Sequence, residues 1–200
     1  MSARVLAFSL LLLVLPIAAC GSPIPGRAVP EPVAAVEPEV PPARPVSEVP
    51  KVERPLDASK YLADPCASLT STQQEAFNVT SSRTNSDKTG TSCIWNVGSG
   101  STSPGVTYST AFTDGLSRLY GLNDIGWWAT GYFEPTEVDG YPAVYVSLAD
   151  LRDEGDCNLV VGINDQLFFE SSIRTPPAND ACLGAKNVAE AILQTIKEGA

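Results

Sequence analysis

The sequence predicts an α+β fold over residues 57–200: one antiparallel sheet with a short N-terminal helix and a long C-terminal helix packed on it. Several segments alternate apolar and polar residues, which is the pattern of strands with one buried face. The last segment instead spaces its apolar residues three and four apart, as an amphipathic helix does. Runs of strands with helices around them indicate an antiparallel sheet with helices packed against it.

The first helix is predicted from Thr70 or Ser71 to about Phe77, because Gln73 or Gln74 three residues after the start completes a capping box. Strands are predicted next at residues 93–97, 106–112 and 141–148. The first and third carry apolar residues along one side: Cys93, Trp95 and Val97 in the first, and Val144, Val146 and Leu148 in the third. Trp95 is therefore assigned to the core.

The end of the chain has the most regular pattern. Residues 157–163 predict a strand with four residues on one face, namely Cys157, Leu159, Val161 and Ile163. Asn164 and Asp165 predict a two-residue type I′ turn, because both tolerate positive φ. A strand over residues 166–173 follows, and then a helix over residues 178–197 that Asn179 or Asp180 caps.

Residues 1–19 have the layout of a lipoprotein signal peptide, in which Arg4 precedes an apolar stretch and small residues lead to Cys20. A membrane-spanning helix needs about 20 apolar residues, and Pro16 ends this stretch too early. Ile-Ala-Ala-Cys resembles the bacterial lipobox, in which the cysteine sulfur carries diacylglycerol. Cys20 is the predicted lipid attachment site, on the extracytoplasmic side of the cell membrane. An ordinary signal peptide would leave Cys20 as an unpaired thiol.

Residues 20–56 predict a lipid-anchored, proline-rich, disordered tether. From Gly21 to Leu56 they hold ten of the chain's 17 prolines and no aromatic residue. Proline favours an extended chain that rises ~3.1 Å per residue, so this segment would reach up to ~110 Å. Its PEVPPARP sequence also has the P-x-x-P spacing of proline-rich recognition ligands, which is the alternative interpretation.

Four cysteines remain in the predicted domain: Cys66, Cys93, Cys157 and Cys182. An even number in an exported chain predicts two disulfides, for which three pairings are possible. Their order favours Cys66 with Cys93 and Cys157 with Cys182. The second bridge would lay the last helix across the face of the strand that starts at Cys157. A zinc site is not expected, because the chain lacks histidine and a C-x-x-C pair.

The chain carries 13 Lys and Arg against 23 Asp and Glu, a formal net charge of −10, and no histidine. The acidic excess falls after Leu56, and the basic residues there are scattered, so nucleic acid is not an expected partner. Without histidine, the usual Cys-His and Ser-His-Asp sites lack a base, and no catalytic residue, metal or cofactor is predicted. The acidic stretch from Asp150 to Asp156 is interpreted as a solvated loop. Arg152 occupies a ligand position there, so it does not fit a calcium loop.

Five short motifs occur in order along the predicted domain: Asp64-Pro65-Cys66, Cys93-x-Trp95, Gly140-Tyr141-Pro142-Ala143, Cys157 opening a strand and Cys182 opening the last helix. Together with the lipobox, this order resembles the actinobacterial lipoprotein family called domain of unknown function 3558. The resemblance implies a disulfide-stabilised domain on the outer face of the plasma membrane and supplies no catalytic residue. Members encoded near type VII secretion genes imply an envelope or secretion-system protein as a partner.

The segment from Gly121 to Phe133 is the candidate binding surface. Its large aromatic residues, Trp127, Trp128, Tyr132 and Phe133, lie among glycines without a clean period. Such side chains can line a pocket for a sugar ring or an acyl chain. The alternative is that they fill the core or seal an edge of the sheet.

The leading functional hypothesis is a noncatalytic cell-envelope lipoprotein that binds a protein partner or an envelope component on the outer face of the plasma membrane. The alternative is a small-molecule carrier that holds a lipid or glycan in an aromatic cavity between sheet and helix. A more remote alternative is a carboxylate-dependent glycan hydrolase, which needs two acids facing each other across a cleft at ~5 to 9.5 Å.

Overall fold

The computed structural model describes residues 47–199, so the predicted signal peptide, Cys20 and the tether as far as residue 46 lie outside the described residues. The elements follow in the order α1 (Ser59–Ala63), the 3₁₀ helix η1 (Pro65–Ser68), α2 (Ser71–Ala76), β1 (Val79–Asp87), β2 (Gly90–Val97), β3 (Ser103–Ser109), α3 (Ser117–Asp124), β4 (Tyr132–Val138), β5 (Tyr141–Ser147), the 3₁₀ helix η2 (Arg152–Glu154), β6 (Asp156–Gly162), β7 (Phe168–Arg174) and α4 (Ala181–Gly199).

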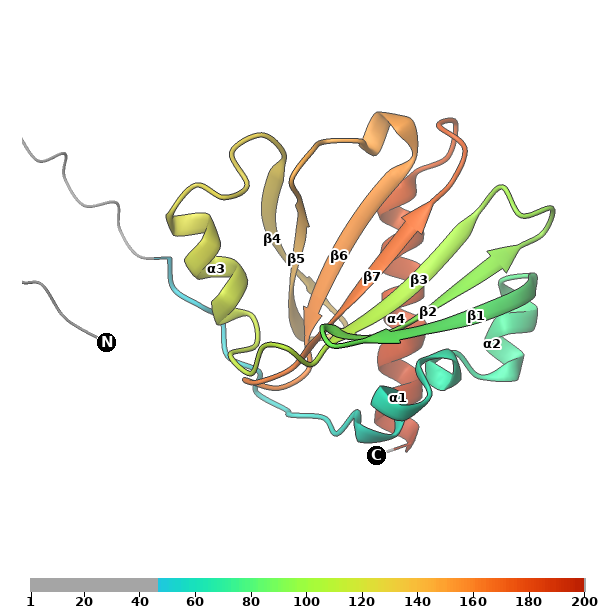
Figure 1. The fold of residues 1–200 in the computed structure, drawn as a ribbon, viewed down its shortest axis with the longest axis horizontal. Helices are drawn as coiled ribbons and strands as arrows, with labels where there is room; N and C mark the ends of the chain where they lie inside the picture. Colours follow the sequence, from blue (N-terminus) through green and yellow to red (C-terminus); the bar gives the residue numbers. More distant parts are fainter. Residues whose placement is uncertain (1–46, 200) are drawn as a thin grey trace, which may run out of the picture. The chain divides into compact units, whose positions relative to one another are not determined.

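All seven strands form one antiparallel sheet in the spatial order β1-β2-β3-β7-β6-β5-β4. The first three strands meet the last four where β3 pairs with β7. Figure 1 shows the long helix α4 running behind the middle of the sheet and α3 on the other side near β4. The predicted α+β fold, with a short helix before the sheet and a long helix after it, is confirmed.

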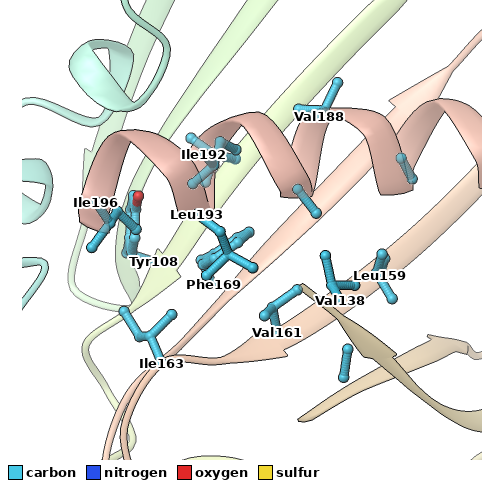
Figure 2. Close-up of a cluster of buried hydrophobic side chains, with 14 of the residues drawn as sticks. Tyr108, Val138, Leu159, Val161, Ile163, Phe169, Val188, Ile192, Leu193 and Ile196 are labelled. Atoms are coloured by element: carbon cyan, nitrogen blue, oxygen red, sulfur yellow. The ribbon is translucent and has the colours of Figure 1, made fainter. Parts of the chain in front are cut away.

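The main core lies between the sheet and α4, which packs chiefly on β6 and β7. Apolar residues three and four apart put one side of α4 into this layer, where Ile192, Leu193 and Ile196 are fully buried. Figure 2 shows these side chains directed toward those of the strands, among them Leu159 and Phe169. Each such side chain contributes roughly 1.5–3 kcal/mol of hydrophobic stabilisation when it is fully buried.

Several polar groups in this layer have hydrogen-bond partners, whereas the buried indole N–H of Trp95 has none among the described residues. Ser171 on β7 donates its hydroxyl to the Ala185 carbonyl oxygen of α4 at 2.8 Å. The hydroxyls of Ser68 and Tyr108 lie 2.8 Å apart, and the Tyr61 hydroxyl donates to the Thr195 carbonyl at 3.0 Å. At these positions the buried polar groups are therefore hydrogen-bonded, as they usually are in stable protein interiors.

Two disulfides link helices to strands of the sheet. Cys66 in η1 pairs with Cys93 in β2, with 5.0 Å between the Cα atoms. Cys157 in β6 pairs with Cys182 in the first turn of α4, with 5.1 Å between the Cα atoms. The pairing that the sequence order favours is confirmed, and the second bridge fixes the start of α4 over β6.

Both predicted helix starts are capped as the sequence indicates. The Thr70 hydroxyl accepts the Gln73 N–H at 3.2 Å while the Gln73 side chain accepts the Thr70 N–H at 2.8 Å, so the capping box is complete. At α4, the Asp180 carboxylate accepts the Leu183 N–H at 2.9 Å. Asp180 therefore serves as the cap of α4, of the two residues that were candidates for it.

The predicted type I′ turn at Asn164 and Asp165 is wrong, because neither residue has positive φ. Instead the Asn164 side-chain oxygen accepts the N–H groups of Gln166 and Leu167, at 2.9 and 2.8 Å, and this holds the β6–β7 loop. The two-residue turn with positive φ joins β4 to β5, where Asp139 has φ 49° and Gly140 has φ 80°.

Residues 47–56, which the sequence assigns to the tether, lie against the domain. The Ser47 hydroxyl donates to Asp124 of α3 at 2.7 Å, and Val52 is buried in the main core. The Leu56 N–H donates to the Ile163 carbonyl at 2.8 Å. The packed chain therefore begins before the predicted boundary at Asp57. No helix between residues 47 and 199 is both long and apolar enough to cross a bilayer.

Candidate functional site

The sheet face opposite α4, which we call the open face, is only partly covered. At the β4–β6 end, α3 and the residue before it pack a second apolar cluster onto the strands: Leu116, Leu119 and Tyr120 against Val144, Val146, Val160 and Phe168. Toward β3 and β1 the same face carries glycine and mostly short polar side chains. This change of side-chain size leaves a hollow beside the α3 cluster.

The strand register builds the floor of that hollow. Ser172 on β7 lies between Gly105 on β3 and Asn158 on β6, so three small or medium residues form one row across the sheet. A Cβ atom at Gly105 would lie 3.0 Å from the Ser172 hydroxyl and 3.3 Å from the Cys93 carbonyl. Because Gly105 has no side chain, nothing rises from this position into the hollow, and a larger residue there would clash with its neighbours.

Two adjoining cavities form a groove along this floor, and both are bordered by Asn158 and Glu170. The polar half has a volume of about 470 Å³ and is lined by Arg83, Ile94, Asn96, Ser103, Gly105, Asp156, Asn158, Glu170, Ser172, Ile173 and Arg174. The apolar half has a volume of about 440 Å³ and adds Thr89, Thr107, Ser109, Phe112, Leu119, Trp128, Val146, Ser147, Leu148, Val160 and Phe168. Each is within the size range of small-molecule sites, roughly 300–1,000 Å³.

Glu170 lies where the two halves meet. On the open face its neighbours in register are Thr107 on β3 and Val160 on β6. Protein atoms surround the carboxyl closely, while the groove keeps the residue partly accessible to solvent. Burial raises the pKa of Glu170, and the nearby charge of Asp156 raises it further. Across residues 47–199, no donor forms a hydrogen bond with this carboxyl.

The other acid in the groove has a different environment. Asp156 on β6 accepts two hydrogen bonds from the Arg174 guanidinium of β7, at 2.7 and 3.2 Å. Arg174 is thereby engaged at the edge of the polar half and is not directed at Glu170. Arg83 stands on β1, the outermost strand at the other end of the polar half.

The remaining acids of the Asp150–Asp156 stretch do not converge on a reaction centre. Arg152 binds the Asp150 carboxylate at 2.6 Å and the Glu134 carboxylate at 3.1 Å on the surface. The hydrogen bonds from Arg152 lower the pKa of Asp150. In the described part of the chain, no group of three or more acidic or cysteine side chains is placed to hold a metal ion.

The four predicted surface aromatics lie in different environments. Trp127 is exposed, while Trp128 lines the apolar half and donates its indole N–H to the Leu119 carbonyl at 3.3 Å. Tyr132 is buried against Cys157, and Phe133 contacts the Tyr120 ring edge-on at a centroid distance of 5.0 Å. The structure does not gather them on one surface, and Trp128 is the one that borders the groove.

The groove residues that the sequence did not identify include Asn158, Glu170 and Ser172. One signal was available for Glu170, because it is the one acidic residue in the Phe168–Arg174 strand and lies directly after two phenylalanines. The others are ordinary polar residues on the outward face of a strand. Their significance comes from which residues lie beside them across the sheet, and the sequence alone does not give that register.

Comparison with known proteins gives one match. A family described as protein of unknown function (DUF3558) matches residues 15–195. No curated protein and no solved structure matches the chain. Because the match spans the described sheet, both disulfides and nearly all of α4, the chain belongs to the DUF3558 family of proteins of unknown function.

Proposed function

We propose that this protein is a noncatalytic, lipid-anchored binding protein of the cell envelope, and that its open-face groove holds an envelope component on the outer face of the plasma membrane. The observation that carries the proposal is the groove itself. It is a preformed hollow of ligand size, it joins a polar to an apolar wall, and at the junction stands an acid that has no partner among residues 47–199. Ligand sites commonly combine apolar walls with a few polar groups in this way.

Two features support the envelope location. The Ile-Ala-Ala-Cys sequence ending at Cys20 supplies a sulfur for acylation after an apolar signal segment. Two disulfides fit an oxidising compartment, because cytosolic thiols are generally kept reduced. Two acyl chains with about 0.8 kcal/mol per buried methylene would hold such a protein on a bilayer.

The carrier hypothesis requires a different binding site from the one that the sequence suggests. The space between the sheet and α4 is filled by side chains such as Trp95, Phe169 and Ile192, each fully buried. A small molecule would therefore bind on the other side of the sheet, in the open-face groove. No catalytic step is assigned to this groove, because Asp156 is ion-paired with Arg174 while Glu170 has no described partner that would activate it.

The anchor is tested by labelling the native host with palmitate. Wild-type protein should carry the label and partition with membranes, and Cys20→Ser should carry none. Label retained by Cys20→Ser, or wild-type protein released without label, would reject the lipid anchor.

The groove is tested by native mass spectrometry of the full chain purified from host membranes. Wild-type protein should carry an extra mass that disappears on denaturation. Asn158→Trp, which fills the junction of the two halves, should lose that mass, whereas Glu75→Trp on the exposed side of α2 should keep it. A bare wild-type mass, or an adduct that survives Asn158→Trp, would reject the groove as the binding surface.

A further inference from the structure

The groove has an acid at its centre with no partner of opposite charge among the described residues. Of its two acids, Asp156 is paired with Arg174, whereas the Glu170 carboxyl has no donor among the residues that the structure describes. Arg83, the remaining cation of the lining, stands on the far strand β1. A carboxylate in a partly desolvated hollow is unfavourable unless an opposite charge or a hydrogen-bond donor accompanies it.

An ammonium group satisfies this position better than a neutral polar group does. It brings positive charge and three donors, and it has no acceptor that would face the carboxylate unpaired. Acceptors stand around Glu170 to take the remaining donors, since the Thr107 hydroxyl is its cross-strand neighbour and Asn158 shares both halves of the groove. The charge of Asp156 favours a cation as well.

The apolar half specifies the rest of the ligand. Phe112, Trp128 and Phe168 line this half, which Glu170 also borders. These rings can bury an apolar body through their area, and the Phe112 ring already faces the Arg118 guanidinium at 4.2 Å. A molecule that joins an ammonium to a compact apolar or aromatic group would therefore meet complementary surfaces in both halves.

We propose that the open-face groove binds a primary ammonium compound, with its ammonium against the Glu170 carboxylate and its apolar body among Phe112, Trp128 and Phe168. This inference rests on the proposed function and names the chemical class of its ligand. The net charge of −10 draws cations toward the protein at low ionic strength and adds to the local attraction.

The test compares three probes of nearly equal shape: phenethylamine, phenethyl alcohol and hydrocinnamate. Binding to the full chain in phosphatidylcholine nanodiscs is measured by titration calorimetry, with empty nanodiscs as the blank. Phenethylamine should bind at least about tenfold more tightly than the alcohol, since a hydrogen bond to a charged group is worth ~1.5–3 kcal/mol. Hydrocinnamate should not bind.

Three variants locate the effect. Glu170→Gln has nearly the same shape without the charge and should reduce the amine to the affinity of the alcohol, while Glu75→Gln makes the same charge change on the exposed side of α2 and should bind as wild type does. Phe112→Ala should weaken the amine and the alcohol by the same factor, because it removes part of the apolar wall and leaves Glu170 in place.

Equal affinities for amine and alcohol, no affinity for the amine, or an amine affinity unchanged in Glu170→Gln would each overturn the proposal. Preferential binding of hydrocinnamate would overturn it in favour of an anion site at Arg83. If the amine fails while native mass spectrometry still finds an adduct that Asn158→Trp abolishes, the ammonium assignment alone is wrong. If both fail, the proposed function fails with it.

Discussion

The two faces of the sheet are built from alternate residues of the same strands, yet they differ in how completely they are packed. On the α4 face, Phe169 is fully buried and the hydroxyl of Ser171 is bonded to the helix. On the open face, the adjacent residues Glu170 and Ser172 line a hollow. The alternation of side chains along a strand therefore separates a face that stabilises the fold from a face left available for binding.

The covering elements explain this difference. The α4 face is covered except at the exposed edge strand β1, because α4 spans β6 and β7 while η1 packs on β2 and β3 (Figure 1). Among the described residues, the open face is covered by one helix, α3, of eight residues, with Val49 and Trp128 packed beside it over one end. A sheet covered on one side and half-covered on the other has room for a ligand without loss of its main core.

The largest expected contrast compares two phenylalanines. Phe169→Ala should lower the free energy of unfolding by about 3–5 kcal/mol, because it leaves a cavity in the sealed layer. Phe112→Ala should lower it by less than about 1 kcal/mol, since Phe112 is 41% exposed and its main described contact is the Arg118 guanidinium. Denaturant unfolding measures both, and similar losses would contradict the division between the faces.

An intermediate contrast compares neighbouring serines. Ser171→Ala removes the hydroxyl that donates to the Ala185 carbonyl and should cost about 1 kcal/mol. Ser172→Ala, one residue later on the open face, should stay within about 0.5 kcal/mol of wild type. Thermal unfolding of the two variants in parallel measures the difference. A larger loss for Ser172→Ala would show that the open face also stabilises the fold.

The smallest expected effect is a change in pH dependence. The pKa of Glu170 is raised in the folded state above its ordinary value of 4.5, so the folded protein holds this proton more tightly than the unfolded chain does. The stability it contributes is thus present below the unfolded pKa and is lost as pH rises through the folded pKa. Glu170→Gln should gain stability relative to wild type over a pH interval that begins near the ordinary value of 4.5 and extends upward.

Melting temperatures across that interval measure this gain, and Glu75→Gln provides the control, because Glu75 is exposed and should show no such trend relative to wild type. The charged groups that line the groove together with Glu170 are Asp156 and Arg174 on the neighbouring ends of β6 and β7 and Arg83 on β1, and all three are present in both variants. Parallel curves for Glu170→Gln and wild type would mean that Glu170 is not desolvated.

Regular patterns made much of the fold predictable. The four apolar positions of the β6 strand and the 3.6-residue period of α4 are strong signals, and Cys157 and Cys182 at the ends of these elements gave their pairing. The capping box at Thr70 was equally local, since its two hydrogen bonds join residues three apart. Each of these features depends on contacts that a short stretch of sequence specifies.

Other elements lacked such a signal. The edge strand β1 is almost wholly exposed and polar, so no alternation marks it. The strand β3 was placed three residues too late, because Pro104 and Gly105 look like a loop although they pair with β7. The hairpin turn was assigned to Asn164 and Asp165, while the Asp139-Gly140 pair, the stronger signal for this turn, was not used.

The groove was the least predictable feature. Its floor joins Gly105 on β3 to Asn158 on β6 and Ser172 on β7, both more than 50 positions later in the sequence, and only the strand register brings them together. The segment from Gly121 to Phe133 was the predicted binding surface because it holds four large aromatic residues. Of its four rings, Trp128 alone lines the groove, and the polar residues that complete it came from strands assigned to the core.

The most direct test of the binding face is photo-crosslinking in intact host cells from two matched leucine positions. Leu148 borders the apolar half of the groove and is 51% exposed, and Leu183 on α4 is 54% exposed. A photoreactive residue at position 148 should form an adduct with an envelope component that is lost when Asn158→Trp fills the groove, and position 183 should form none. Equal adducts from both positions, or an adduct from position 183 alone, would contradict the assignment of binding to the open face.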